Sequence, residues 1–374
     1  MSAPLTDLLP QDYATGTFLG RMQTADGPSV IIIREGVLYD LTPVVSTSSG
    51  AVARRVFDGG ERIGTVEEGL PEGCSLLTPI DLQCIKASGV TFALSAIERV
   101  IEERARGDAA KAAEIRTQLE DKVGSGIRSV VPGSDEAMQL KEALIGEGMW
   151  SQYLEVAIGP DAEIFSKSPV LSSVGAGQQI GVRSDSSWNN PEPEVVLVCD
   201  AHGKVVGAAL GNDVNLRDFE GRSALLLSKA KDNTASCSIG PFIRLFDDTF
   251  GIDDVRGAVV ELTIEGPEGY HLEGTNEMAQ ISRDPLDLVE QCLSEHHYPD
   301  GFVLFCGTLF APTQDRDQEG AGFTHKVGDT VTIASQRIGR LSNTVTTSRD
   351  APAWTMGIGE FVRNLSKRGL IDKI

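Results

Sequence analysis

The segment 190–198 reads NPEPEVVLV and places two glutamates at the start of an apolar run. Prolines on both sides of Glu192 fix the backbone φ angle and exclude a helix, and the apolar, valine-rich run after Glu194 favours a strand. Because side chains alternate between the faces of a strand, Glu192 and Glu194 would share one face. Neighbouring carboxylates repel and raise each other's pKa, a cost that a divalent cation would remove.

A third acid, Asp213, follows the next apolar run, 205–208, which the turn at 200–203 joins to the first. We predict that Asp213 completes a metal site with Glu192 and Glu194. Carboxylate oxygens suit Mg²⁺, Mn²⁺ or Ca²⁺ better than zinc, and Mg²⁺ is preferred because it leaves positions for water or substrate. Paired acids on a strand are also typical of a solvated face, so this motif alone leaves both interpretations open.

Other short apolar runs bounded by turn residues predict further strands. They lie at 195–198, 205–208, 258–262 and 302–305. One helix is predicted among them, capped by Asp284 with Pro285 at its first position and ending near Leu293. A last helix is predicted at 358–367, ending before Gly369.

The N-terminal part of the chain also reads as strands. The run 29–33 is rich in β-branched residues, and Glu35-Gly36 is typical of a hairpin turn before the run 37–39. We therefore predict a small β-rich N-terminal domain over residues 1–80, followed by a catalytic domain over residues 81–374.

Residues 95–146 change to a helical pattern and predict an insert in the catalytic domain. Ser95 and Glu98 have the spacing of a capping box, with serine at the N-cap and glutamate at N3. Further helices are predicted at 109–123 and 135–145. Glycine-rich turns between the helices suggest that the insert forms a lid.

The formal net charge of −21 disfavours binding to nucleic acid or to anionic membranes, because both carry negative charge. The six cysteines form no Cys-x-x-Cys pair, which indicates free thiols in a reducing compartment. The sequence shows no signal peptide and no apolar stretch of the roughly 20 residues that span a bilayer. We expect a cytoplasmic protein.

Five blocks in consistent order resemble the fumarylacetoacetate hydrolase superfamily. They are GVTF at 89–92, PEPE at 191–194, GNDVNLRD at 211–218, Lys231 with CSIGP at 237–241, and CGT at 306–308. The resemblance covers roughly residues 85 to 345. It implies an α+β, mostly β fold with a mixed β-roll core, and a homodimer or higher homo-oligomer.

The resemblance also implies roles for individual residues. Glu192, Glu194 and Asp213 match the metal-binding acids of the family, Lys231 matches its active-site lysine, and Thr308 matches the threonine that contacts the substrate carboxylate. Lys167 is a weaker candidate for facing the substrate.

One departure concerns the reaction. Hydrolytic members carry a His-x-x-Glu pair that activates water, whereas Ser95 and Glu98 occupy the matching positions here. The segments 165–168 and 182–188 resemble a branch that dehydrates 2-keto-3-deoxy sugar acids. The resemblance therefore implies a magnesium-dependent dehydratase that converts such an acid to 2,5-dioxopentanoate. We expect the substrate to be a 2-keto-3-deoxy-pentonate.

Two alternatives remain at this point: an acylpyruvate or diketo-acid hydrolase of the same superfamily, and a catalytically silent binding protein. In the dehydratase the metal would accept the carboxylate and 2-oxo oxygens of the small 2-oxo acid substrate. The proton at C3 needs a base. Lys231, with its pKa lowered by burial and the cation, and Glu98 are both candidates, and Glu98 would also be explained by helix capping alone.

Overall fold

The computed structural model describes residues 4–106, 108, 111–112, 115, 130–146, 148–310, 312, 314–317 and 322–374. Its strands are β1 (Thr17–Thr24), β2 (Gly27–Arg34), β3 (Val37–Asp40), β4 (Glu61–Thr65), β5 (Ser75–Leu76), β6 (Cys84–Gly89), β7 (Glu163–Ser168), β8 (Gln179–Val182), β9 (Asn189–Asn190), β10 (Pro193–Cys199), β11 (Val205–Asp213), β12 (Asn215–Leu216), β13 (Cys237–Leu245), β14 (Val259–Glu265), β15 (His271–Glu277), β16 (Phe302–Phe305), β17 (Thr330–Ser335) and β18 (Gly339–Thr347). The helices of the described part are α1 (Ser48–Arg54), α2 (Ala93–Ala105), α4 (Asp135–Gly146), α5 (Gln152–Ile158), α6 (Arg217–Glu220), α7 (Leu227–Lys231), α8 (Ile252–Arg256), α9 (Pro285–Leu293) and α10 (Ile358–Lys367).

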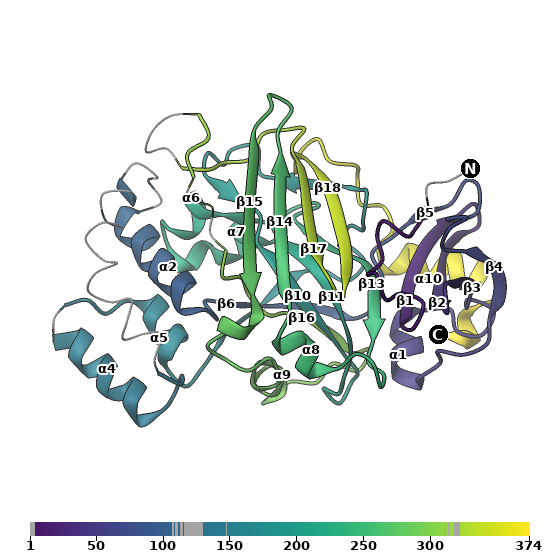
Figure 1. Ribbon diagram of the computed structural model, residues 1–374, viewed down its shortest axis with the longest axis horizontal. Helices are drawn as coiled ribbons and strands as arrows, with labels where there is room; N and C mark the ends of the chain where they lie inside the picture. The colour runs from purple at the N-terminus through teal and green to yellow at the C-terminus, as the bar shows by residue number, and fades with distance from the viewer. Residues whose placement is uncertain are drawn as a thin grey trace.

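Two large mixed sheets form most of the molecule (Figure 1), and β9 and β12 pair as a separate two-stranded sheet. The larger sheet has the order β4-β3-β2-β1-β13-β11-β10-β16-β6-β7, with β5 added beside β1. The smaller one has the order β15-β14-β17-β18-β8. Most neighbours are antiparallel, but β16 pairs with β6 and β18 pairs with β8 in parallel. The expected α+β, mostly β class is confirmed.

The main core lies between the two sheets. Leu197 and Leu210 of the larger sheet and Leu262 and Ile333 of the smaller one belong to one buried cluster. Val196, on the opposite face of β10, belongs to a second cluster that includes residues of α1. Both faces of the larger sheet are therefore covered, which explains why β10 reads as a continuous apolar run rather than an alternating one.

Local sequence signals placed several elements correctly. The hairpin between β2 and β3 turns at Glu35 and Gly36, whose φ angles of 51° and 73° are positive, as a type I′ turn requires. Asp284 caps α9, and its carboxylate accepts a hydrogen bond from the Leu286 backbone N–H at 2.9 Å. Helix α10 ends before Gly369, which has a φ of 67°.

The strands from residues 17–65 belong to the same sheet as β10 and β11, because β1 pairs with β13. In Figure 1 they lie with α1 and α10 on the right, on the side of both chain termini. The division of the chain at residue 80 stays a prediction. Among the helices in the described ranges, none combines the length and apolar character that crossing a bilayer requires.

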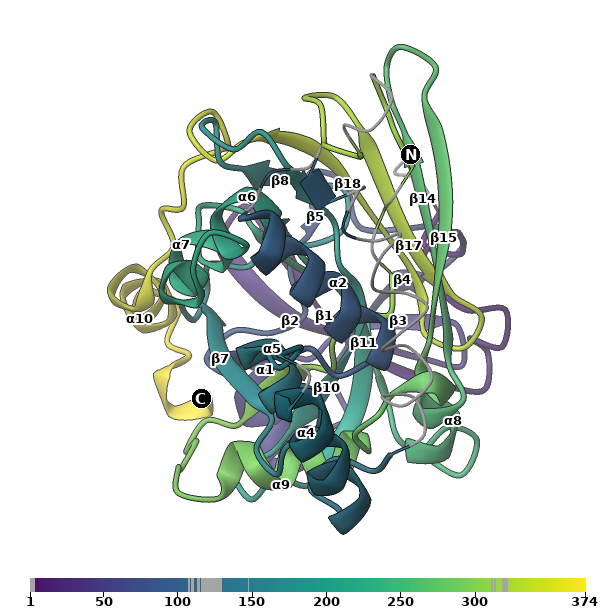
Figure 2. The ribbon, with the colours of Figure 1, turned by 90° about the vertical axis from the view of Figure 1, so that its left-hand side faces the viewer.

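Helices α2 and α4 cover most of the described part of the predicted insert and α5 follows it, and Figure 2 shows the three together on the face toward the viewer. They share a small core, to which α2 contributes Ile97 and Ile101 and α5 contributes Leu154 and Ile158. The predicted helix at 135–145 is confirmed by α4. The predicted helix at 109–123 falls outside the described residues.

The predicted capping box at the start of α2 is wrong. The N-cap is Phe92, so Ser95 is the N3 residue. Its hydroxyl bonds back to the backbone of Phe92, donating to the carbonyl at 2.8 Å and accepting from the N–H at 3.3 Å. The helix begins earlier than expected because the N3 hydroxyl satisfies the N-cap backbone without a polar N-cap side chain.

Candidate metal and catalytic site

Three carboxylates meet where β10 begins and β11 ends. The antiparallel pairing sets Glu194 opposite Gly211, and the Asp213 backbone N–H donates to the Glu192 carbonyl at 3.1 Å. Glu192, Glu194 and Asp213 are all buried, and each offers an oxygen within 4.8 Å of the other two. The alternation of side chains along β10 and the hairpin register therefore bring the three predicted acids together.

The acids differ in their electrostatic surroundings. Burial and the repulsion of Asp213 and Glu192 raise the pKa of Glu194 well above its ordinary value. Burial also acts against ionisation of Asp213, but Lys167 and Lys231 outweigh it and lower the pKa of that carboxyl. Ionisation is therefore unfavourable for the Glu194 carboxyl and favourable for the Asp213 carboxyl.

A backbone N–H group orients the Glu194 carboxylate. The Gly307 N–H donates to Glu194 Oε2 at 2.6 Å. Gly307 has a φ of 89°, and a Cβ atom there would lie 2.0 Å from Thr91 Oγ1. Only glycine fits this position without strain, and this explains why the CGT block has a glycine at residue 307.

Two buried lysines face the acids. The Lys231 ammonium, at the end of α7, bonds to Glu192 and lies 3.1 Å from Asp213 Oδ2. The Lys167 ammonium, on β7, lies 2.6 Å from Asp213 Oδ1 and donates to the carbonyls of Val214 and Lys231 at 3.1 and 2.5 Å. Lys167 thus holds Asp213 in place.

The carboxylates around Lys231 act on its pKa against burial. Burial alone would lower it, but Asp213, Glu192 and Glu220 outweigh burial and raise the pKa above its ordinary value. The protein groups alone therefore keep Lys231 charged. The predicted lowering of this pKa by burial together with a bound cation stays a prediction.

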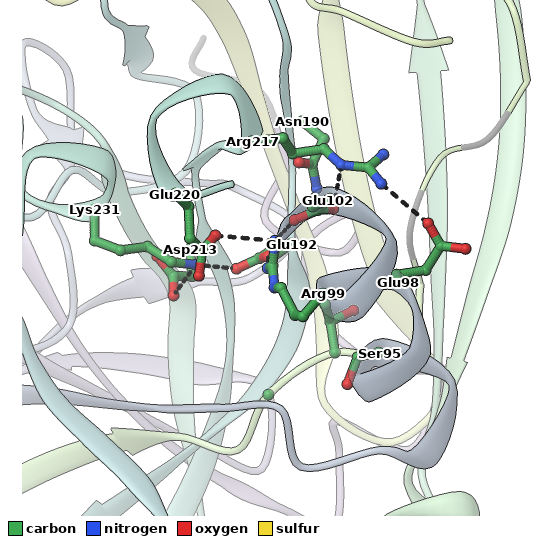
Figure 3. Close-up of polar contacts among 12 residues, drawn as sticks. Ser95, Glu98, Arg99, Glu102, Asn190, Glu192, Asp213, Arg217, Glu220 and Lys231 are labelled. Atoms are coloured by element: carbon green, nitrogen blue, oxygen red, sulfur yellow. Dashed lines mark hydrogen bonds and ion pairs between the residues drawn. The ribbon is translucent and has the colours of Figure 1, made fainter. Parts of the chain in front are cut away.

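Arg99 of α2 connects the insert to this cluster (Figure 3). Its guanidinium lies 2.6 Å from Glu192 Oε1, 2.7 Å from Glu102 Oε2 and 2.9 Å from Glu220 Oε2. Arg217 continues the network, with Nε 2.6 Å from Glu102 Oε1. A single, largely buried arginine therefore joins α2 and α6 to one of the three clustered acids.

Glu98 points away from the three acids. Its carboxylate lies 3.1 Å from Arg217 Nη2, on the far side of α2 from Glu192 in Figure 3. Ser95 and Arg99, four residues apart, instead share the face of α2 that lines the site. Of the two residues that match His-x-x-Glu, Ser95 thus lies at the site and Glu98 in the ion-pair network beside it.

A cavity of about 20 Å³ lies next to the acids. Glu192, Glu194, Lys231, Thr308 and Ser95 all contribute to its wall. Among the described residues that line it, none is a histidine.

Glu163 also lines this cavity and was not anticipated. It lies on β7 against Gly89, where a Cβ atom would come within 2.0 Å of its carboxylate. Burial and the nearby Glu220 raise the pKa of Glu163 to about 7. The alternation along β7 offered a signal, because Glu163, Phe165 and Lys167 are two residues apart and a strand puts such residues on one face.

The donor set fits a hard divalent cation. Three buried carboxylates supply oxygen ligands, and the raised pKa of Glu194 shows that its negative charge lacks full compensation. A dication at this point would relieve that repulsion. Glu192, Glu194 and Asp213 are the residues that would hold it.

Comparison with known proteins places the fold. Residues 160–346, half of the chain, match the family model described as fumarylacetoacetate (FAA) hydrolase C-terminal. A solved structure, 2-keto-3-deoxy-D-arabinonate dehydratase complexed with magnesium and 2,5-dioxopentanoate, aligns with a TM-score of 0.63 and 21% identity. The alignment covers 88% of this chain and 99% of that one. The expected mixed β-roll core is thereby confirmed.

Two curated proteins are similar over about half of the chain. The probable 2-keto-3-deoxyxylonate dehydratase of Haloferax volcanii is 33% identical over 199 residues, which cover 53% of this chain and 65% of that protein. The 2-dehydro-3-deoxy-D-arabinonate dehydratase of Saccharolobus solfataricus is 30% identical over 193 residues, which cover 52% of this chain and 63% of that protein. The matches span just under two thirds of these relatives.

Proposed function

The chain belongs to the fumarylacetoacetate hydrolase family, and from this premise we propose that it is a magnesium-dependent dehydratase of 2-keto-3-deoxy sugar acids. The observation that carries the proposal is the wall of the cavity beside the three acids. Ser95 stands there in place of a histidine, while Glu163 and Lys231 supply groups that hold or transfer protons.

Dehydration of such an acid requires proton transfers rather than an activated water. The C3 proton and the C4 hydroxyl leave together as water, and the unsaturated 2-oxo acid from a five-carbon substrate tautomerises to 2,5-dioxopentanoate. When bound by the three acids, Mg²⁺ would polarise the 2-oxo group and stabilise the negative charge that develops on its oxygen.

Glu163 is the best-placed group for the proton. A carboxyl with a pKa of about 7 is close to evenly divided between its two forms at neutral pH, so it can accept the C3 proton and return it to the leaving hydroxyl. Lys231 is held as a cation by Glu192 and Asp213, which suits it to attract the anionic substrate. Thr308 adds a hydroxyl for the substrate carboxylate.

The similarity to the two curated dehydratases supports the substrate class, and the magnesium complex of the solved neighbour supports magnesium as the cation. Mn²⁺ and Ca²⁺ would satisfy the same oxygen donors less specifically. A homodimer or larger homo-oligomer, which the family resemblance implies, and a cytoplasmic location, which the cysteines and the N-terminal sequence suggest, complete the proposal as predictions.

The direct test incubates the protein and Mg²⁺ with each isomer of 2-keto-3-deoxy-pentonate and measures 2,5-dioxopentanoate. We expect turnover of at least one isomer and its loss in EDTA. Release of pyruvate from acylpyruvates, with no dehydration of any isomer, would contradict the proposal and favour the hydrolase.

A further inference from the structure

A second and larger hollow, about 520 Å³, lies on the other side of the two buried lysines. Its wall is built from the end of β7 and from the residues that follow β8, α7 and β18, with Trp354 at one side. The volume lies within the range of roughly 300–1,000 Å³ that is usual for small-molecule sites. The hollow shares no lining residue with the cavity beside the three acids.

The two hollows are nevertheless adjacent along the chain. Lys167 and Lys231 turn toward Asp213, while the next residues, Ser168 and Asp232, line the second hollow. A ligand in the second hollow would therefore touch the immediate neighbours of both lysines that hold Asp213.

Some polar groups of this hollow are paired, Arg183 with Asp185 and Ser168 with Ser172, but three others in the described part of the chain are not. Within the described ranges, the Asp232 carboxylate and the Arg349 guanidinium line the hollow without a hydrogen bond or ion pair to another side chain. Ser348 Oγ is buried and has no hydrogen-bond partner. Buried polar atoms are seldom left unpaired in proteins, so the Ser348 hydroxyl indicates a polar ligand, and the exposed Asp232 and Arg349 side chains are open to the same ligand.

The lining also defines the chemistry of that ligand. A free guanidinium matches a carboxylate in a two-pronged hydrogen bond, and a free carboxylate together with the hydroxyls of Ser184 and Thr234 matches several ligand hydroxyls. Trp354 is 48% exposed and offers an apolar ring against which the carbon chain can pack. An anionic head and a hydroxylated chain are the features of a sugar acid.

We propose that this hollow, lined by Asp232, Thr234, Ser348, Arg349 and Trp354, is a second binding site for a sugar acid. The ligand class follows from the lining alone and does not depend on the function proposed for the three acids. Arg349 binds the carboxylate of the ligand, and Asp232 binds its hydroxyls.

Calorimetric titration of the full chain with D-xylonate in EDTA tests this site, because removal of divalent cations disables the three-carboxylate site as a chelate for the ligand. We expect one binding event that Arg349→Gln weakens about tenfold or more, as the loss of a charge-assisted hydrogen bond predicts. Trp354→Ala should weaken binding as well. The matched control is Arg340→Gln, an exposed arginine on β18 outside the hollow, which should bind as the wild type does.

Neutral D-xylose and zwitterionic L-serine serve as comparison ligands. The proposal predicts that both bind at least tenfold more weakly than D-xylonate, because one lacks the carboxylate and the other lacks the hydroxylated chain. The proposal is overturned if D-xylonate does not bind, if its binding survives Arg349→Gln and Trp354→Ala together, or if either comparison ligand binds equally well.

Discussion

Glu192 carries a cationic partner on each carboxylate oxygen, Arg99 on Oε1 and Lys231 on Oε2. Its neighbours Glu194 and Glu163 have no such pairing, and their pKa values are raised. At the scale of single residues, two cations therefore hold Glu192, whereas the negative charges of Glu194 and Glu163 are energetically unfavourable. A bound cation would relieve the charge of Glu194, and a proton would relieve that of Glu163.

Replacement of Glu163 by glutamine removes the proposed proton carrier and retains its size. We expect kcat for the dehydration to fall about 100-fold or more, within the usual range for a lost general acid–base group, while Mg²⁺ affinity stays the same. Steady-state kinetics and calorimetry measure the two quantities. Glu261→Gln, at an exposed position on β14, should change neither. Unchanged kcat in Glu163→Gln would remove this residue from the mechanism.

Asp329 provides a pH test away from the site. Arg316 and His325 hold its pKa at about 2, below the ordinary value of 3.8. Because the folded-state pKa is the lower one, its contribution to stability is present above about pH 4 and is lost as the pH falls toward 2, and the contribution amounts to about 2 kcal/mol.

The free energy of unfolding should therefore decline more steeply with falling pH between 4 and 2 in the wild type than in Asp329→Asn. Chemical denaturation at a series of pH values measures this difference. Equal slopes for both proteins would show that the ion pairs of Asp329 do not stabilise the fold.

At the scale of elements, α2 is the part of the insert that the site holds directly. Arg99 lies one turn beyond Ser95 and pairs with acids from α2, α6 and the segment before β10. Removal of one partner from a buried ion-pair network leaves uncompensated charge and costs about 3–5 kcal/mol. Arg99 therefore ties α2 to the acids of the site, in addition to the ion pairs of Arg217 and the packing of Ile97 and Ile101.

We expect Arg99→Gln to lower the free energy of unfolding by about 3 kcal/mol and to speed hydrogen exchange along α2. Arg363 is a matched control, because it is also a helical arginine three residues from a glutamate but the pair is exposed. Arg363→Gln should change stability by less than about 0.5 kcal/mol. Similar losses in both variants would show that the buried network has no special role.

Sequence signals located the strands better than the helical insert. β10 and β11 follow from apolar runs and turns, and the hairpin register then brings Asp213 to Glu192 without further information. The start of α2 was misplaced because the signal at Ser95 is a hydroxyl that bonds to the Phe92 backbone from the N3 position. A local pattern cannot distinguish these two uses of one serine.

At the scale of the whole molecule, long-range contacts decide what the sequence could not. Arg99 of α2 meets Glu220 of α6 through a pairing that no local spacing encodes. The same holds for β1, which joins the central sheet by pairing with β13 more than 200 residues away in sequence. Strand identity is local, but the order of strands in a sheet is not.

The central claim is that Glu192, Glu194 and Asp213 together bind one divalent cation. Calorimetric titration of the metal-free protein with Mg²⁺ tests it most directly, with Glu192→Gln and the exposed-site control Glu261→Gln alongside. The account predicts one Mg²⁺ per chain for the wild type and the control, and no measurable binding by Glu192→Gln. Absence of binding by the wild type, or equal affinity in Glu192→Gln, would contradict it.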